Sequence, residues 1–142
     1  MQQRISIITL GVAALQPALE FYTALGWQRA NAEQEIVAYD CNGFVFALYE
    51  RDKLADDAQA SLSAHQDGHA AFTLAYNVHS KQEVDDMLEQ ACAAGAKLVK
   101  AAHEVFWGGY SGYFADLDGF LWEVAYNPYS QPKADGSFSW NG

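Results

Sequence analysis

Asp116-Leu117-Asp118-Gly119-Phe120-Leu121-Trp122-Glu123-Val124 is the stretch that decides the fold, because a second version of it occurs earlier in the chain. The earlier version is Asp40-Cys41-Asn42-Gly43-Phe44-Val45-Phe46-Ala47-Leu48. Each joins an Asn-Gly or Asp-Gly pair to a run with alternating large apolar side chains, which is typical of a tight β-hairpin. This recurrence predicts that the chain consists of two related modules.

The elements around the two copies follow one order. Glycines at positions 26 and 95 are expected to end the two helices, and Thr9-Leu10 recurs as Thr73-Leu74. The apolar periodicity therefore predicts two βαβββ modules. The first has strands over residues 4–12, 28–30, 36–41 and 44–49 and a helix over 15–25. The second has strands over 70–78, 98–101, 110–116 and 120–126 and a helix over 81–94.

We expect one α+β domain over residues 1–142, with modules at about 4–50 and 69–127 that form a curved mixed sheet with the helices outside and a concave cleft. The polar residues 51–68 are expected to be a linker, and residues 128–142 a C-terminal tail. The second helix is the clearest element, since Ser80 and Glu83 have the spacing of a capping box. Its predicted apolar stripe, which includes Met87 and Cys92 as core residues, is Val84, Met87, Leu88, Ala91 and Cys92.

The composition excludes several classes of function. The chain has 142 residues, with 8 Lys and Arg against 18 Asp and Glu, which gives a formal net charge of −10. This charge opposes binding to nucleic acid or to an anionic membrane surface. No apolar run approaches the ~20 residues of a membrane span, and Cys41 and Cys92 form no disulfide framework or zinc motif. We therefore expect a cytoplasmic protein with neither nucleic acid nor membrane as a partner.

Strand alternation predicts which side chains face away from the helices, since successive strand residues point to opposite faces of a sheet. If the two modules pack side by side, these side chains line one largely apolar cleft. Glu123 is the one carboxylate among them, and a carboxylate in apolar surroundings needs a partner, a metal or a catalytic role, so it is the candidate catalytic residue. The cleft residues are Ile7, Thr9, Ala47, Tyr49, Ala71, Thr73, Leu121, Glu123 and Ala125.

A second candidate region combines aromatic side chains with three glycines between Phe106 and Tyr113. Its spacing matches no phosphate-binding loop. Aromatic side chains suit ligand contact, which makes Trp107 and Tyr110 candidate ligand-binding residues, and they equally suit a core or a dimer interface. Both interpretations stay open from the sequence.

The paired modules, the run Phe21-Tyr22-Thr23-Ala24-Leu25-Gly26-Trp27 and the D-x-D-G-x-x-W-E pattern ending at Glu123 together resemble the vicinal oxygen chelate superfamily. The resemblance spans about residues 5–127. This superfamily includes glyoxalase I, extradiol dioxygenases, fosfomycin-resistance enzymes and bleomycin-resistance proteins. It implies a fold of two βαβββ modules around a small-molecule site.

The resemblance also implies where a divalent metal would bind, through one residue on each of four strands. By motif these positions are Ile7, Ala47, Ala71 and Glu123, of which only Glu123 has a side chain that can bind a metal. A catalytic metal needs about three N, O or S ligands, so we expect no metal cofactor. If a divalent metal is retained, Glu123 and His69 are its first candidate ligands, followed by Asp116 and Tyr49.

The expected function is to bind a small organic molecule in an aromatic and apolar cleft. This resembles the metal-free bleomycin-resistance proteins, which are acidic homodimers that sequester a cationic drug. One alternative is a lyase or dioxygenase-type enzyme in which Glu123 acts as acid, base or metal ligand. The other is a dimeric interaction module with a vestigial cleft, in which the tail crosses to the other subunit or caps the cleft.

Overall fold

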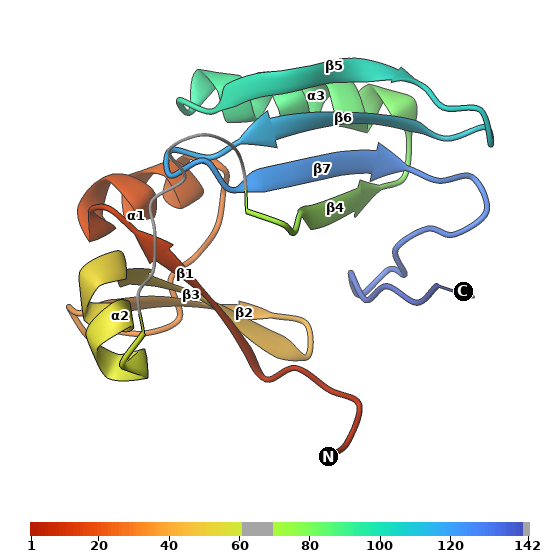
Figure 1. Cartoon of the computed structure of the whole chain (residues 1–142). Helices are drawn as coiled ribbons and strands as arrows, with labels where there is room; N and C mark the ends of the chain where they lie inside the picture. Colours follow the sequence, from red (N-terminus) through yellow and green to blue (C-terminus); the bar gives the residue numbers. More distant parts are fainter. Residues whose placement is uncertain (61–69, 141–142) are drawn as a thin grey trace. The chain divides into compact units, whose positions relative to one another are not determined.

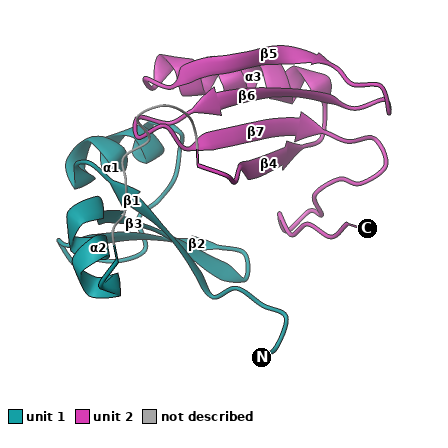
Figure 2. Cartoon of the chain, in the orientation of Figure 1, with its two compact units in different colours: residues 1–66 teal, residues 67–142 magenta. Residues whose placement is uncertain are grey.

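The computed structural model describes residues 1–60 and 70–140. The chain divides into two compact units, residues 1–66 and 67–142 (Figures 1 and 2). The first unit contains a mixed sheet of three strands, and the second contains a mixed sheet of four strands. The described strands thus form two separate sheets. The α+β class is confirmed. None of the described helices is long and apolar enough to cross a membrane.

The first unit places a parallel pair of strands beside an antiparallel one. Its strand order is β1-β3-β2, in which β1 runs parallel to β3 and β2 runs antiparallel to it. The hairpin turns at Asn42 and Gly43, and the φ of +102° at Gly43 explains why a glycine is needed there. The elements are β1 (Ile7–Val12), α1 (Leu15–Ala24), β2 (Ile36–Cys41), β3 (Phe44–Glu50) and α2 (Arg51–Ala58).

The core of the first unit lies between α1 and its sheet. Tyr22 of α1 is buried, and its ring centroid lies 5.3 Å from Trp27 and 5.4 Å from Phe46. Tyr39 of β2 completes this aromatic cluster, 5.9 Å from Tyr22. The alternation predicted for β3 places Phe46 and Leu48 in the core, and both are at most 1% exposed.

The predicted strand over residues 28–30 is wrong. Instead, the Asn31 side chain forms hydrogen bonds with backbone groups at the outer edge of β2. Its Nδ2 donates to the Ile36 carbonyl at 2.9 Å, and its Oδ1 accepts from the Ala38 amide at 2.9 Å. Only one backbone bond, from the Ala30 amide to the Ala38 carbonyl, resembles a strand pairing. The edge is therefore covered by an asparagine where the second module has a strand.

The predicted linker contains a helix, α2 (Arg51–Ala58), that the sequence pattern did not indicate. None of its residues is buried, so it has no apolar stripe to detect. It forms from residues of good or moderate helix propensity, alanine above all, directly after β3. The rest of the linker, from residue 61, lies outside the described residues.

The second unit repeats the arrangement with a fourth strand. Its order is β4-β7-β6-β5, in which β4 runs parallel to β7 and the other neighbours are antiparallel. Figure 1 shows α3 against one face of this sheet. The elements are β4 (Leu74–Val78), α3 (Lys81–Ala93), β5 (Lys97–Glu104), β6 (Tyr110–Ala115) and β7 (Leu121–Tyr126).

The boundaries of α3 are set as the sequence predicts. Ser80 Oγ accepts a hydrogen bond from the Glu83 amide at 3.2 Å, and the Glu83 carboxylate accepts one from the His79 amide at 3.0 Å. Gly95 has a φ of +110° and ends the helix. The prediction that Cys92 is a core residue is wrong. Its side chain is exposed, because it lies at the outer margin of the apolar stripe.

The strand β4 begins at Leu74, four residues later than predicted. Its register also differs from the simple repeat. Thr9 lies opposite Ala47 in the first unit, but it is Ala75, not Thr73, that lies opposite Glu123 in the second. The two modules therefore share topology while their parallel strands are offset by two residues, which keeps each side chain on its face.

Candidate functional site

The two faces of the second sheet have different roles. One face meets α3: a Cβ placed on Gly112 would lie 2.7 Å from Leu88 Cδ1 of that helix. Phe114 and Trp122, directly opposite each other on the same face, stack with ring centroids 6.1 Å apart. Because side chains alternate along a strand, Tyr113 and Glu123 lie on the other face.

Glu123 is paired with a phenol. Tyr113 lies directly opposite Glu123 across β6 and β7, close enough for the Glu123 carboxylate to act on its phenol electrostatically. Burial raises the pKa of Tyr113, and the Glu123 charge adds to this, so the phenol stays protonated and remains a donor.

Two further polar residues share this face. His103 of β5 lies opposite Ser111 of β6, and Ser111 is 4% exposed. The Nδ1 atom of His103 is buried and has no hydrogen-bond partner among the described residues. An unpaired buried nitrogen is unfavourable, because the group has lost its water and gained nothing in return. We use the name polar face for the set Glu123, Tyr113, Ser111 and His103.

Of these four residues, Glu123 alone is predicted from the sequence. Tyr113 could have been found by pairing β6 with β7 about the Asp118-Gly119 turn, which sets it opposite Glu123. His103 gave no such signal. It falls in a stretch predicted to be a connection, and β5 has register irregularities between Leu98 and His103 that break simple alternation.

The other predicted residues of the second unit are dispersed. Leu121 and Ala125 flank Glu123 on its side of β7. Thr73 and Ala71 precede β4 and are exposed. The two aromatic candidates lie elsewhere. Tyr110 donates to Asp85 of α3 at 2.9 Å, on the opposite face from Glu123, and Trp107 lies over Gly109 in the β5–β6 turn.

The predicted residues of the first unit lie on two adjacent strands. Ile7 and Thr9 belong to β1, and Ala47 and Tyr49 to β3. Thr9 is directly opposite Ala47. Their exposure differs widely, since Ala47 is 1% exposed and Ile7 is 57% exposed. They form one strip of the sheet within their own unit.

The residues at the expected metal positions do not fit a divalent ion. Glu123 is the single donor side chain among the four, and in residues 1–60 and 70–140 no group of three His, Cys, Asp or Glu could hold a metal. Asp116 has a structural role, because its Oδ1 accepts from the Asp118 and Phe120 amides at 3.0 and 2.9 Å. His69 lies outside the described residues. We therefore derive no step through a metal.

Comparison with known proteins gives the family. The sequence model of the Glyoxalase/Bleomycin resistance protein/Dioxygenase superfamily matches residues 4–124. A glyoxalase-related enzyme from Fulvimarina pelagi is 34% identical, with a TM-score of 0.91 and coverage of 99% of this chain and 100% of that one. A hypothetical protein from S. aureus is 25% identical, with a TM-score of 0.76 and coverage of 89% and 95%.

A lactoylglutathione lyase from Agrobacterium tumefaciens is 22% identical, with a TM-score of 0.67 and coverage of 89% of this chain and 96% of that one, which supports the fold alone. No curated protein matches the chain. The match to the family model spans most of the sequence, and the duplicated topology agrees with it. The chain belongs to the Glyoxalase/Bleomycin resistance protein/Dioxygenase superfamily.

Proposed function

We propose that the chain binds a small organic molecule on the polar face of its second unit, with Glu123 as the anchoring group and without a resident metal. The observation that carries this proposal is the Tyr113 phenol directly opposite the Glu123 carboxylate, on the same face as a buried, unpaired nitrogen of His103. The family supports it at a coarser level, since its name covers both drug-resistance proteins and enzymes on small molecules.

The chemistry of the polar face indicates the class of ligand. An ionised carboxylate accepts about four hydrogen bonds, so Glu123 can accept from a cationic or hydrogen-bond-donating group of a ligand. A ligand group that pairs with His103 Nδ1 would remove the cost of that buried nitrogen. The ligand we propose is amphipathic, with a cationic group for Glu123 and a polar group for His103.

The same proposal includes the apolar contacts expected from the sequence. Leu121 and Ala125 flank Glu123 on β7, and Ala75 lies opposite it on β4. We propose these residues as the apolar surroundings of the ligand. The strip Ile7, Thr9, Ala47 and Tyr49 of the first unit remains a prediction of ligand-binding residues, as do Ala71, Thr73 and Trp107 of the second unit.

Titration with amphipathic cationic drugs, bleomycins included, tests the proposal by calorimetry. We expect micromolar binding that Glu123→Gln weakens at least tenfold, which corresponds to about 1.4 kcal/mol. Glu89→Gln is the matched control, because it removes the same charge from an exposed position of α3. No binding across the panel, or an equal loss in the control, would overturn the proposal.

A second candidate is an enzyme in which Glu123 transfers a proton. It is favoured by the 34% identity to a glyoxalase-related enzyme over the whole of that chain. Tyr113, which stays protonated, could then donate to developing negative charge on the substrate. Rates of the parent and Glu123→Gln with hemithioacetal and catechol substrates decide this. A loss of at least a hundredfold supports catalysis, and equal rates exclude an acid–base role for Glu123.

A further inference from the structure

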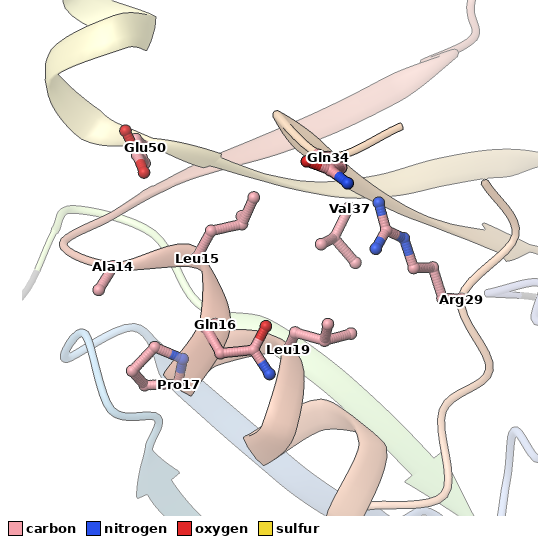
Figure 3. A pocket seen from close by; sticks show the side chains of 9 residues that line it. All are labelled: Ala14, Leu15, Gln16, Pro17, Leu19, Arg29, Gln34, Val37 and Glu50. Atoms are coloured by element: carbon pink, nitrogen blue, oxygen red, sulfur yellow. The ribbon is translucent and has the colours of Figure 1, made fainter. Parts of the chain in front are cut away.

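The first unit has a pocket of its own beside the first turns of α1. Its volume is about 330 Å³, within the usual range for small-molecule sites. It lies between the first turns of α1, the connection to β2 and the end of β3 (Figure 3). The lining residues are Ala14, Leu15, Gln16, Pro17, Leu19, Arg29, Gln34, Val37 and Glu50.

Arg29 forms the cationic end of this pocket. Its Nε donates to Asn31 Oδ1 at 3.0 Å and its Nη2 donates to the Ile36 carbonyl at 3.0 Å, so the guanidinium is held in place. A guanidinium has five N–H donors, and these two bonds use two of them. Glu33 interacts with Arg29 electrostatically but is fully exposed, where water weakens the attraction.

Glu50 forms the anionic end. Figure 3 shows Glu50 and Arg29 on opposite sides of the pocket, with Leu15 and Val37 between them. Lys53 Nζ lies 3.4 Å from the Glu50 carboxylate, in a pair whose side chains are both more than 40% exposed. Such a pair contributes ~0.2–1 kcal/mol, so a ligand cation can replace Lys53.

We propose that this pocket binds a small zwitterion whose carboxylate and ammonium groups are separated by an apolar chain. Arg29 binds the carboxylate, because a guanidinium matches its geometry with paired N–H donors. Glu50 binds the ammonium, and the alkyl chain lies over Leu15 and Val37. A zwitterion carries no net charge, so the overall charge of −10 does not repel it.

Three probes of one chain length test the charge pattern: ε-aminocaproate, caproate and hexylamine. Amide and Arg29 Nε–H chemical shifts in ¹⁵N NMR spectra report binding at the pocket. We expect saturable shifts at the lining residues and an affinity for ε-aminocaproate at least tenfold above that for either single-charge probe. Equal affinities, or shifts that do not saturate, would overturn the proposal.

Glu50→Gln is the decisive variant, since its side chain is exposed and its loss leaves the fold intact. This variant should lower the affinity for ε-aminocaproate to that for caproate, and it should leave the affinity for caproate unchanged. Glu35→Gln is the matched control, because Glu35 also lies near Lys53, at 3.7 Å, but does not line the pocket. An equal effect of the two variants would contradict the assignment. Glu123→Gln should have no effect, which separates this site from the polar face.

Discussion

Glu123 and Tyr113 face each other across two strands, and the two differ in how far the sequence reveals them. Alternation along one strand is a local property, so the face of Glu123 follows from Phe120, Trp122 and Val124 being apolar. The partner on the next strand depends on register, which the turn at Asp118-Gly119 sets. His103 depends on a bulged strand and could not be predicted in this way.

Tyr39 is the residue whose removal should stabilise the fold. Its hydroxyl is buried without a hydrogen-bond partner among the described residues, and the side chain is 2% exposed. Tyr39→Phe removes the unpaired hydroxyl and keeps the ring, so we expect the free energy of unfolding at neutral pH to rise by about 1 kcal/mol. Urea denaturation measures this, and a loss of stability would show that the hydroxyl has a partner.

The same residue predicts a pH dependence. Burial raises the pKa of Tyr39 from 10.0 to about 12. Between these values the unfolded chain loses the proton and the folded chain keeps it, so stability is present below pH 10.0 and falls as the pH rises toward 12. Over this pH range, the free energy of unfolding of Tyr39→Phe should fall by about 2 to 3 kcal/mol less than that of the parent chain. Parallel curves for the two proteins would contradict the assignment.

At the scale of elements, helices were predicted where they carry a stripe or a cap. Ser80 and Gly95 bound α3 because a hydroxyl and a positive φ are local requirements. The helix α2 has neither a buried residue nor a capping side chain, so no residue pattern indicates it. The prediction of a strand at residues 28–30 is wrong because the Asn31 side chain makes the hydrogen bonds to β2 that a strand would make. A residue pattern does not reveal such side-chain bonds.

Asn31 should therefore be important for β2. Its side chain accepts from Arg29 and the Ala38 amide and donates to the Ile36 carbonyl. Asn31→Ala leaves those groups without their partner, and we expect the free energy of unfolding to fall by about 2 kcal/mol. Hydrogen exchange at the Ala38 amide should accelerate. Gln28→Ala, at an exposed neighbouring position, is the control, and an equal effect there would argue against this role.

Gly112 should be equally sensitive, for a different reason. A Cβ at this position would lie 2.7 Å from Leu88 Cδ1 and 2.9 Å from the backbone of Ala102 and Lys100. We expect Gly112→Ala to cost about 1 to 3 kcal/mol, since α3 must move away from β6. Trimming Leu88 to alanine in the same chain should not restore stability, because the backbone contacts remain. Thermal denaturation of both variants checks this.

At the scale of the whole molecule, the duplication predicted from the two hairpin motifs is present in the topology. The order β1-β3-β2 corresponds to β4-β7-β6, and β5 has no counterpart in the first unit. Register could not be predicted, because pairing between parallel strands depends on packing across the sheet. The metal positions implied by the family motif stay a prediction, and Glu123 is the one of those four positions whose side chain can bind a metal.

Metal content of the whole chain is the direct test of that chemistry. After exposure to Zn, Ni, Mn and Fe(II), we expect plasma mass spectrometry to find far less than one equivalent, since Glu123 alone cannot hold an ion. Untagged protein is required, and Glu123→Ala is the control. About one equivalent that is lost in this variant would show that the ligand assignment by motif is wrong and would favour a glyoxalase-like or dioxygenase-like enzyme.

We also expect a homodimer in solution. Phe106, Tyr129 and Trp140 are 102%, 80% and 84% exposed, and aromatic side chains are enriched in protein interfaces. Light scattering on a sizing column should give a mass near twice the 15.6 kDa of the chain. If the measured mass at micromolar concentration is that of one chain, these exposed aromatic side chains do not form a dimer interface.

The asparagine on the edge of β2 has a consequence for aggregation. An edge strand with unpaired amides and carbonyls is a template on which another chain can grow. Asn31 occupies such groups on one border of the first sheet, and in the second sheet β5 has register irregularities and the lysines Lys97 and Lys100. Irregular or charged borders reject added strands. One side chain thus protects an edge of the three-stranded sheet against the addition of a strand from another chain.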